Sequence, residues 1–282
     1  MKTERKDLKP TGRKGKSSDL PVITLLTDFG TADYFVGAVK GAILSINPRA
    51  VIVDITHEIA PQDIDAAAFT LFASYQTFPA GTIHVVVVDP GVGSTRRPIV
   101  VSAGKQFFVG PDNGVFTYIY DREPRHRTHH ATQEKYFRQP TSTTFHGRDI
   151  FAPVAAALST GVKPQAFGPS VTDAVRLENL LRPVVQTNGR IEGRVIHIDR
   201  FGNCITNLTR DIVKGAPEML LIKEKQISSF REFFSDASAA NELFAIWGSA
   251  GFLEIAINRG SAALTLGVKR GEPVVLSTDY AD

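Results

Sequence analysis

Residues 85–101 read VVVVDPGVGSTRRPIVV, and this stretch decides the class of fold. Four consecutive valines are typical of a strand buried on both faces, as in a parallel sheet that is covered by helices. The strand then delivers the chain to Asp89, a Pro-Gly turn and two arginines, Arg96 and Arg97. A structural role alone does not require a carboxylate there, so the end of this strand is the first candidate for a functional site.

The strand belongs to an alternating pattern of strands and helices. Apolar strand-like runs lie at Val22–Leu26, Val51–Ile55 and Ile83–Val88, with helical patterns at residues 33–46 and 61–76 and a last helix at 148–162. This alternation predicts an α/β protein whose amino-terminal domain contains a mostly parallel sheet. Ligands of such sheets bind beyond the carboxyl ends of the strands. The polar segments that follow the three strands are therefore expected to meet at one site.

A different pattern begins beyond residues 177–189, which are rich in Asn, Arg and Pro. Short apolar runs separated by turn residues follow, namely GRVIHIDRFGN, EMLLIKE, ELFAIWG, GFLEIAIN and GEPVVLS. They predict a smaller antiparallel, barrel-like β domain over residues 188–280. The α/β domain is expected to span residues 20–180, so the predicted boundary falls near residue 180.

The positive charge of the chain is concentrated at its start. Residues 1–19 contain seven Lys and Arg against three Asp and Glu, so this segment has a net charge of +4. The whole chain has a net charge of +3, and the remaining residues therefore carry about −1. The segment has no apolar periodicity and is expected to be a disordered basic tail. Since the rest of the chain is nearly neutral and has no basic stripe, nucleic acid is not an expected partner.

Compartment is indicated by what the sequence lacks. No apolar run approaches the roughly 18 residues that are needed to cross a bilayer, and the tail lacks the apolar segment of a secretory signal. Cys204 is the only cysteine, so no intrachain disulfide can form. This usage suits a reducing environment, and we expect a cytoplasmic protein with no membrane partner.

The segment DPGVGSTRR (89–97) has two interpretations. It is not a phosphate-binding P-loop, because no Gly-Lys-Ser/Thr follows, and it lacks the third glycine of the dinucleotide fingerprint. In the structural interpretation Asp89 caps a Pro-Gly turn and both arginines are solvated. In the functional interpretation Asp89 takes part in chemistry. The segment alone leaves both open.

A second segment, TSTTFHGRDIFAP (141–153), precedes the last predicted helix. In the simplest structural interpretation, Asp149 is a residue at the start of a helix, where the helix dipole favours a negative charge, and Arg148 is its exposed neighbour. This interpretation does not explain His146. A metal site is a weaker alternative here and at RHRTHH (125–130), because there is no histidine pair at helical spacing and no second cysteine. The latter segment is better explained as polar surface.

Two further segments lie in the predicted β domain. HIDRFGNCITNLT (197–209) places Asp199, Phe201 and Asn203 close together, which suits purine recognition, since an aromatic face stacks and amides bind the base edge. The same residues also form ordinary turns. WGSAGFLEIAINRGSAA (247–263) contains Ser249, Glu254 and Asn258, but in isolation it indicates only a strand, a turn and a strand.

Taken together and in this order, these segments resemble the S-adenosylmethionine (SAM) hydrolases, also called SAM hydroxide adenosyltransferases. That family is related to fluorinases and chlorinases, which cleave the same substrate with a halide. The resemblance spans about residues 21–276. Its carriers are TDFG (27–30), HEIAPQDI (57–64), VVDPGVGSTRR (87–97), GPDNG (110–114), FHGRD (145–149), DRFGN with ITN (199–207), and GSAGFLEIAIN with GSAA (248–263).

The resemblance implies a function and a catalytic set. Asp89, Arg96 and His146 match the residues that handle the attacking water, whereas the halogenases carry a tyrosine, a threonine and a tyrosine there. The implied reaction is hydrolysis of SAM at the 5′ carbon of the ribose, giving adenosine and L-methionine, with no cofactor and no metal. The alternatives are halide-dependent cleavage of SAM, a non-catalytic protein that binds adenosine or SAM, and, more remotely, a metal-dependent hydrolase.

The resemblance also implies the substrate contacts. Asp28 matches a ribose ligand, and the other expected substrate-binding residues are Asp199, Phe201, Asn203, Phe234, Ser249, Glu254 and Asn258. Two positions depart from the halogenase pattern: Gln62 replaces a tryptophan and Ala250 replaces a methionine-binding arginine. The family further implies a homotrimer in which each pocket forms between the large domain of one subunit and the small domain of its neighbour.

Overall fold

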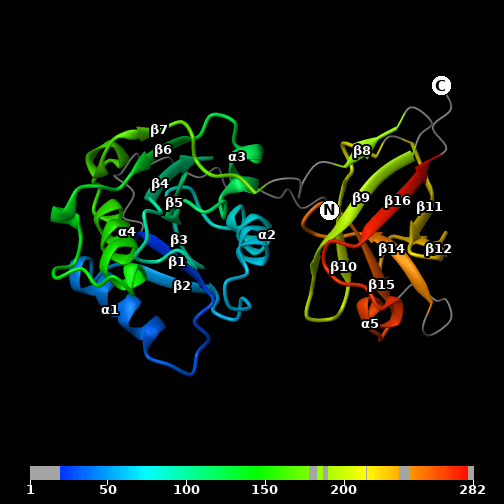
Figure 1. The fold of residues 1–282 in the computed structure, drawn as a ribbon, viewed down its shortest axis with the longest axis horizontal. Helices are drawn as coiled ribbons and strands as arrows, with labels where there is room; N and C mark the ends of the chain where they lie inside the picture. The colour runs from blue at the N-terminus through cyan, green and yellow to red at the C-terminus, as the bar shows by residue number, and fades with distance from the viewer. Residues whose placement is uncertain (1–19, 178–182, 187–189, 214, 235–241, 279–282) are drawn as a thin grey trace, which may run out of the picture.

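A computed structural model describes residues 20–177, 183–186, 190–213, 215–234 and 242–278. These residues form two sheets, one from each half of the sequence, with helices packed mainly on the first (Figure 1). The predicted tail at 1–19 and the predicted boundary near residue 180 lie outside the described residues. Both therefore stay predictions.

The first sheet has seven strands in the order β2-β1-β3-β5-β4-β6-β7. They are β1 (Val22–Thr27), β2 (Val51–Thr56), β3 (Ile83–Val87), β4 (Pro98–Ala103), β5 (Gln106–Pro111), β6 (Arg127–His130) and β7 (Ser170–Val171). The predicted α/β class is confirmed. The sheet is mixed, because β2, β1, β3 and β5 pair in parallel while β4, β6 and β7 add antiparallel strands. Gly104 and Lys105, with φ of 55° and 67°, form the two-residue turn that folds β4 back onto β5.

Helices cover both faces of this sheet, α1 and α4 on one side and α2 and α3 on the other (Figure 1). Their bounds are α1 (Phe35–Ile46), α2 (Ile64–Tyr75), α3 (Thr117–Arg122) and α4 (Ala152–Ser159), with short helices η1 (Glu134–Tyr136), η2 (Gly147–Phe151) and η3 (Pro164–Phe167). The valine run explains this layering. Val85 and Val87 are buried against the α1 and α4 side, and Val86 and Val88 against the α2 and α3 side. No helix within the described residues is long and apolar enough to span a bilayer.

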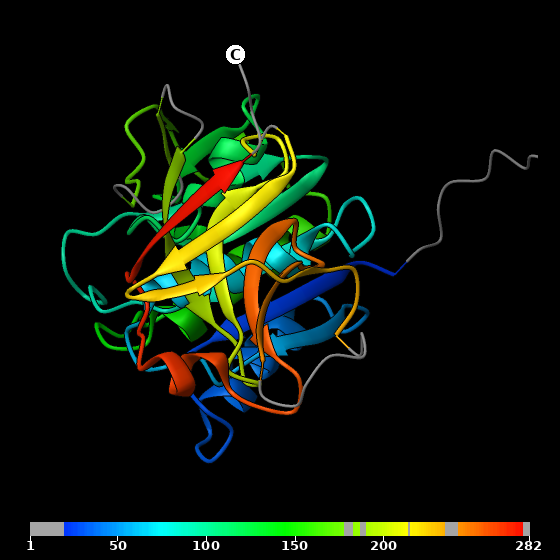
Figure 2. The ribbon, with the colours of Figure 1, turned by 90° about the vertical axis from the view of Figure 1, so that its right-hand side faces the viewer.

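The second sheet is a nearly closed, barrel-like sheet, as predicted (Figure 2). It contains β8 (Val184–Val185), β9 (Arg190–Ile198), β10 (Cys204–Thr209), β11 (Pro217–Ile222), β12 (Lys225–Ile227), β13 (Phe230–Arg231), β14 (Leu243–Trp247), β15 (Phe252–Ile257) and β16 (Pro273–Thr278), with one helix, α5 (Ala262–Leu266). Neighbouring strands are antiparallel except β13 and β14. The strands enclose a separate apolar core.

Helix α2 links the two sheets. The ring of Phe69 in α2 stacks on His197 in β9, with 4.6 Å between ring centroids, and also contacts Phe252 in β15 at 5.9 Å. At the start of α2, Asp63 accepts a hydrogen bond of 2.7 Å from Arg270. The core on this face of the first sheet is therefore continuous with the second sheet.

Candidate active site

Asp89, Arg96 and His146 meet in one hydrogen-bonded cluster. Arg96 donates from Nε to Oδ1 of Asp89 over 3.0 Å and from Nη2 to Oδ2 over 2.5 Å. The same Nη2 lies 2.9 Å from Nδ1 of His146. The side chains of Arg96 and Asp89 are only 7% and 5% exposed. A planar guanidinium thus joins a buried carboxylate to an imidazole just beyond the end of β3.

Two consecutive turns bring Arg96 back to Asp89. The amide of Val92 donates to the carbonyl of Asp89, and the amide of Ser94 donates to the carbonyl of Gly91. Gly93 has a φ of 78°, and a Cβ at this position would lie 2.3 Å from the carbonyl oxygen of Thr143. Glycine is therefore required for the loop to pack against the segment that precedes His146.

Burial sets the protonation of the cluster. It raises the pKa of Asp89 above its ordinary value, and the charge and hydrogen bonds of Arg96 oppose the shift without cancelling it. Burial lowers the pKa of His146, and the charge of Arg96 lowers it further. Because a guanidinium only donates, Nδ1 of His146 is the acceptor, and the neutral ring carries its proton on Nε2. Nε2 is thus available as a donor.

Arg97 has a different role from Arg96. It donates to Asp112 over 2.7 Å and to Asp173 over 2.8 Å. Asp112 in turn accepts from the amide of Val175. Arg97 therefore fastens the end of β5 to the segment around residue 173. The interpretation in which both arginines are solvated is wrong.

Asp28 leaves the first sheet beside Asp89. Thr27 pairs with Val87 across the parallel strands β1 and β3, so Asp28 and Asp89 emerge at the same edge, one residue apart in register. Oδ2 of Asp28 accepts the amide of Gln62 over 2.8 Å. Gln62 has a φ of 67°, in the left-handed region. The segments TDFG and HEIAPQDI thus form one surface, and an amide anchors the expected ribose ligand.

The expected substrate contacts of the second half meet around a pocket of about 970 Å³. Those that line it are Asp199, Phe201, Asn203, Phe234, Ser249 and Glu254. Asn258 is not among the lining residues, although its neighbours Ile257 and Arg259 are. All lining residues fall between Asp199 and Gly260, so the pocket receives none of the residues at the edge of the first sheet.

A tight turn between β9 and β10 shapes one wall of this pocket. Oδ1 of Asp199 accepts the amides of Phe201 and Asn203, and Oδ2 accepts the side-chain amide of Asn203 over 2.9 Å. The turn-forming interpretation of this segment is therefore confirmed, and purine recognition stays a prediction. Phe201 is 77% exposed, so its ring is accessible for stacking on a ligand.

Glu254 contributes a second carboxyl group to the pocket. Burial, with the nearby charge of Asp199, raises the pKa of Glu254 to about 7. A Cβ at residue 248 would lie 1.7 Å from Oε1 of Glu254, so a larger residue there would displace this carboxyl group. Two carboxyl groups beside exposed aromatic rings suit a ligand that carries both a cation and a flat ring.

The residues of this pocket that sequence reasoning missed include Glu232, Phe233 and Trp247. Phe233 is 55% exposed and directly precedes the expected stacking residue Phe234. The signal was present, because two adjacent aromatic residues in a polar segment cannot both be buried on one face of a strand. Trp247 ends β14 and had been assigned to a plain strand.

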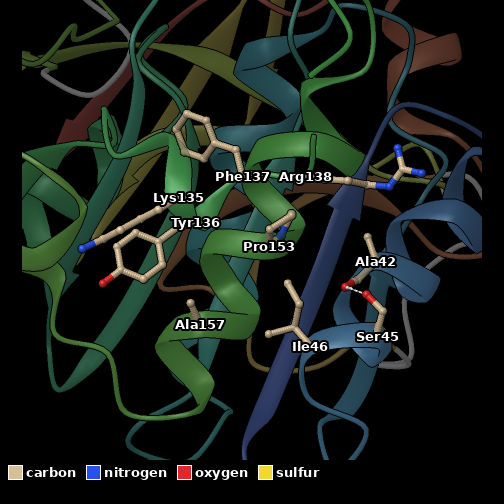
Figure 3. Close-up of a pocket in the computed structure, with 9 residues that line it drawn as sticks. All are labelled: Ala42, Ser45, Ile46, Lys135, Tyr136, Phe137, Arg138, Pro153 and Ala157. Carbon is tan, nitrogen blue, oxygen red and sulfur yellow. Dashed lines mark hydrogen bonds between the residues drawn. The ribbon is translucent and has the colours of Figure 1, made fainter. Parts of the chain in front are cut away.

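A second cavity, of about 390 Å³, lies between α1, η1 and α4 (Figure 3). Its polar lining includes Lys135, Tyr136 and Arg138, and its apolar lining includes Ile46 and Pro153. It contains none of the residues expected from the sequence to act on substrate.

The alternative of a metal site finds no group of metal-ligating side chains in the described residues. Within the part of the chain that the structure describes, no three His, Cys, Asp or Glu residues are grouped so that they could hold a metal ion. His129 and His130 of the segment RHRTHH lie in β6, where burial lowers the pKa of both. They pair with β4 across the sheet.

Comparison with known proteins identifies relatives over most of the chain. Residues 23–168 match the model of the SAM hydroxide adenosyltransferase N-terminal domain, and residues 193–275 match that of the C-terminal domain. An (R)-S-adenosyl-L-methionine hydrolase of Thermus thermophilus is 40% identical over 262 residues, which cover 90% of this chain and 98% of the relative. A fluorinase of an Actinoplanes species is 25% identical over 291 residues, covering 91% and 97%. A crystal structure of a conserved protein from Thermotoga maritima is 37% identical, with a TM-score of 0.84 and coverage of 90% and 99%.

Proposed function

The chain belongs to the SAM hydroxide adenosyltransferase family, and on that premise we propose that it hydrolyses SAM to adenosine and L-methionine. The observation that carries the proposal is the buried cluster of Asp89, Arg96 and His146. The resemblance assigns these positions to the attacking water, and the halide-using relatives differ at all three. The residues therefore support water as the nucleophile.

The chemistry needs help only at the nucleophile. The oxygen of water attacks the 5′ carbon of the ribose, the carbon–sulfur bond breaks, and its electron pair stays on sulfur. The sulfonium thus leaves as the neutral thioether of methionine, so the leaving group needs no proton. Water is a poor nucleophile. The protein must hold it in line, about 3 Å from the carbon, and accept its proton.

The cluster is suited to both tasks. Asp89 accepts the proton, because a carboxylate whose pKa is raised by burial is a stronger base. Nε2–H of His146 donates to the water oxygen and so directs its second lone pair at the carbon. Arg96 fixes both partners through its planar fork and keeps Asp89 ionised before the reaction.

Substrate contacts divide between the two sheets. Asp28 would hold the ribose hydroxyls, and the pocket around Phe201 and Phe234 would bind adenine and methionine. Because that pocket has no lining from the first sheet, it supports a site completed by a neighbouring subunit in a homotrimer. A head-to-tail contact of this kind closes into a ring.

The compartment proposed for this enzyme is the cytoplasm. Cys204 is buried and unpaired in the structure, which suits a reducing environment. SAM, the proposed substrate, is the only small-molecule partner required. Neither nucleic acid nor a membrane enters the proposal.

Product analysis tests the proposed function. Purified protein is incubated with SAM, with and without added chloride or fluoride, and the nucleosides are separated by chromatography. We expect adenosine and methionine in equal amounts, at a rate that does not depend on halide. A 5′-halo-adenosine would identify halide-dependent cleavage, and intact SAM together with measurable binding would identify a binding protein.

Metal removal should leave the activity unchanged. The neutral leaving group needs no Lewis acid, and Asp89 accepts the proton, so no step requires a metal ion. Protein dialysed against EDTA is expected to turn over SAM at the untreated rate, with metal content checked by elemental analysis. Loss of activity that one divalent ion restores would contradict this expectation.

A further inference from the structure

Arg96 is contacted by His146, which caps the short π turn η2 (Gly147–Phe151), and by the last residue of that turn. His146, which directly precedes η2, places Nδ1 at 2.9 Å from Nη2 of Arg96. Phe151, the last residue of η2, places its ring 5.3 Å from the guanidinium carbon of Arg96. One short segment of backbone therefore places two side chains against Arg96.

The π geometry makes this double contact possible. Residues five apart in an α-helix are separated by about 140° around the axis and face different ways. In η2 the amide of Ala152 donates to the carbonyl of Gly147, an i to i+5 hydrogen bond. This wider turn brings residues five apart toward the same side, and such turns occur frequently at functional sites. An α-helical turn would not present both His146 and Phe151 to Arg96.

Asp149, in the middle of η2, fastens the turn. Its side chain is fully buried and accepts hydrogen bonds from Nε and Nη2 of Arg148 over 2.6 and 2.8 Å. The amide of Ser142 donates to its Oδ2 over 2.9 Å. The amide of Arg138 donates to its backbone carbonyl over 2.8 Å. Asp149 thus ties Arg138 and Ser142, two points of the segment that leads to His146.

The charge of Asp149 is maintained in this buried position. Burial by itself would raise the pKa of Asp149, but hydrogen bonds from Arg148 and Ser142 outweigh it and hold the pKa below its ordinary value. Arg148 is anchored in turn, since its guanidinium carbon lies 5.0 Å from the ring of Phe145. That ring packs edge-on against Phe29, the neighbour of Asp28. The hydrogen-bonded pair of Asp149 and Arg148 therefore lies close to both the water-handling cluster and the expected ribose ligand, Asp28.

We propose that Asp149 is a positioning residue of the hydrolytic reaction, which fastens η2 so that His146 and Arg96 hold the orientation in which they act on water. This inference rests on the proposed function. Asp149 has no contact with the 970 Å³ pocket and pairs with neither Asp89 nor Arg96. It acts through the turn and through its charge, which opposes the lowering of the pKa of His146. Its loss should therefore affect turnover and leave substrate binding intact.

The test separates turnover from binding in Asp149→Asn, which keeps the volume of the side chain and removes its charge. We expect kcat to fall on the order of 10- to 100-fold, because misplacement of a reacting group by about 1 Å has effects of that size. KM, and the Kd of SAM measured by calorimetry, should stay near their wild-type values. A purely structural role would lower the melting temperature and leave the kcat of the folded protein unchanged.

Variants of Arg148 and Arg138, which both contact Asp149, keep the test from depending on a single substitution. Arg148→Ala should lower kcat in the same way, and Arg148→Lys should restore part of the loss. Arg138→Ala is the matched control, because Arg138 is 52% exposed, lines the separate cavity of Figure 3 and contacts Asp149 only at 3.4 Å. It should keep a nearly wild-type kcat. If Asp149→Asn does not fold, the kcat of Arg148→Ala alone tests the positioning role.

Two kinds of negative result can be told apart. Wild-type kcat in folded Asp149→Asn or in Arg148→Ala, beside an active wild-type enzyme, would overturn the positioning role alone. A wild-type enzyme that leaves SAM intact would overturn the proposed function, and the positioning role with it.

Discussion

Replacing Asp89 with alanine is expected to lower the turnover of SAM by about 10³-fold, within the range that a positioned general base contributes. The variant loses the proton acceptor and leaves Arg96 without its carboxylate partner, so the water is neither deprotonated nor held. Binding of SAM should survive, because the proposed adenine and methionine contacts lie in the second sheet. Turnover is measured from adenosine formation, and binding from calorimetry.

Asp112→Asn is the matched control for this prediction. Asp112 is as buried as Asp89, with a side chain 2% exposed, and it pairs with Arg97, the residue beside Arg96. Breaking a buried ion pair such as Arg96–Asp89 destabilises a fold by about 3–5 kcal/mol. The Arg97 side chain is 28% exposed, so Asp112→Asn should cost less, but both variants should have lower melting temperatures. Only Asp89→Ala should lose turnover at a temperature where both are folded. Equal losses in the two variants, or an active Asp89→Ala, would remove Asp89 from the reaction.

Two inactive variants are expected to restore activity when they assemble together. Asp89→Ala disables the water-handling half of the site, and Asn203→Ala disables the half formed by the second sheet. In a trimer whose pockets form between neighbours, random mixing gives about one pocket in four with both halves intact. Co-expressed in equal amounts, the variants should therefore recover about a quarter of wild-type activity.

The mixed assemblies must be verified for this result to count. Two different affinity tags, used in sequential purification, select oligomers that contain both variants, and mass measurement gives the subunit number. Each variant purified alone and mixed without exchange is the control, and it should stay inactive. Verified mixed trimers with no activity would show that each pocket is completed within one chain.

The amino-acid sequence by itself determined the class of fold. The predicted strands at Val22–Leu26 and Val51–Ile55 end within one residue of the observed strands, as does Ile83–Val88. A strand buried on both faces needs an uninterrupted apolar run, and that requirement is local and visible in the sequence. The antiparallel half of the first sheet was missed. Its hairpin depends on two residues with positive φ, Gly104 and Lys105, one of which is not glycine.

The candidate site was partly visible in the same way. Asp89, Arg96 and His146 stood out because a structural role did not account for them or because they matched a family pattern. The sequence could not assign different roles to the adjacent residues Arg96 and Arg97. Arg96 reaches a histidine 50 residues away, and Arg97 reaches an aspartate 76 residues away.

Only the tertiary structure decided how these groups are held. It placed Asp149 at the centre of a π turn, where the sequence indicated no more than the start of a helix. It also left Asn258 outside the pocket that its neighbours line. The physical reason is common to these cases. Burial and the direction of a side chain are set by contacts between segments far apart in the chain, whereas a local pattern specifies only which face of its own element is apolar.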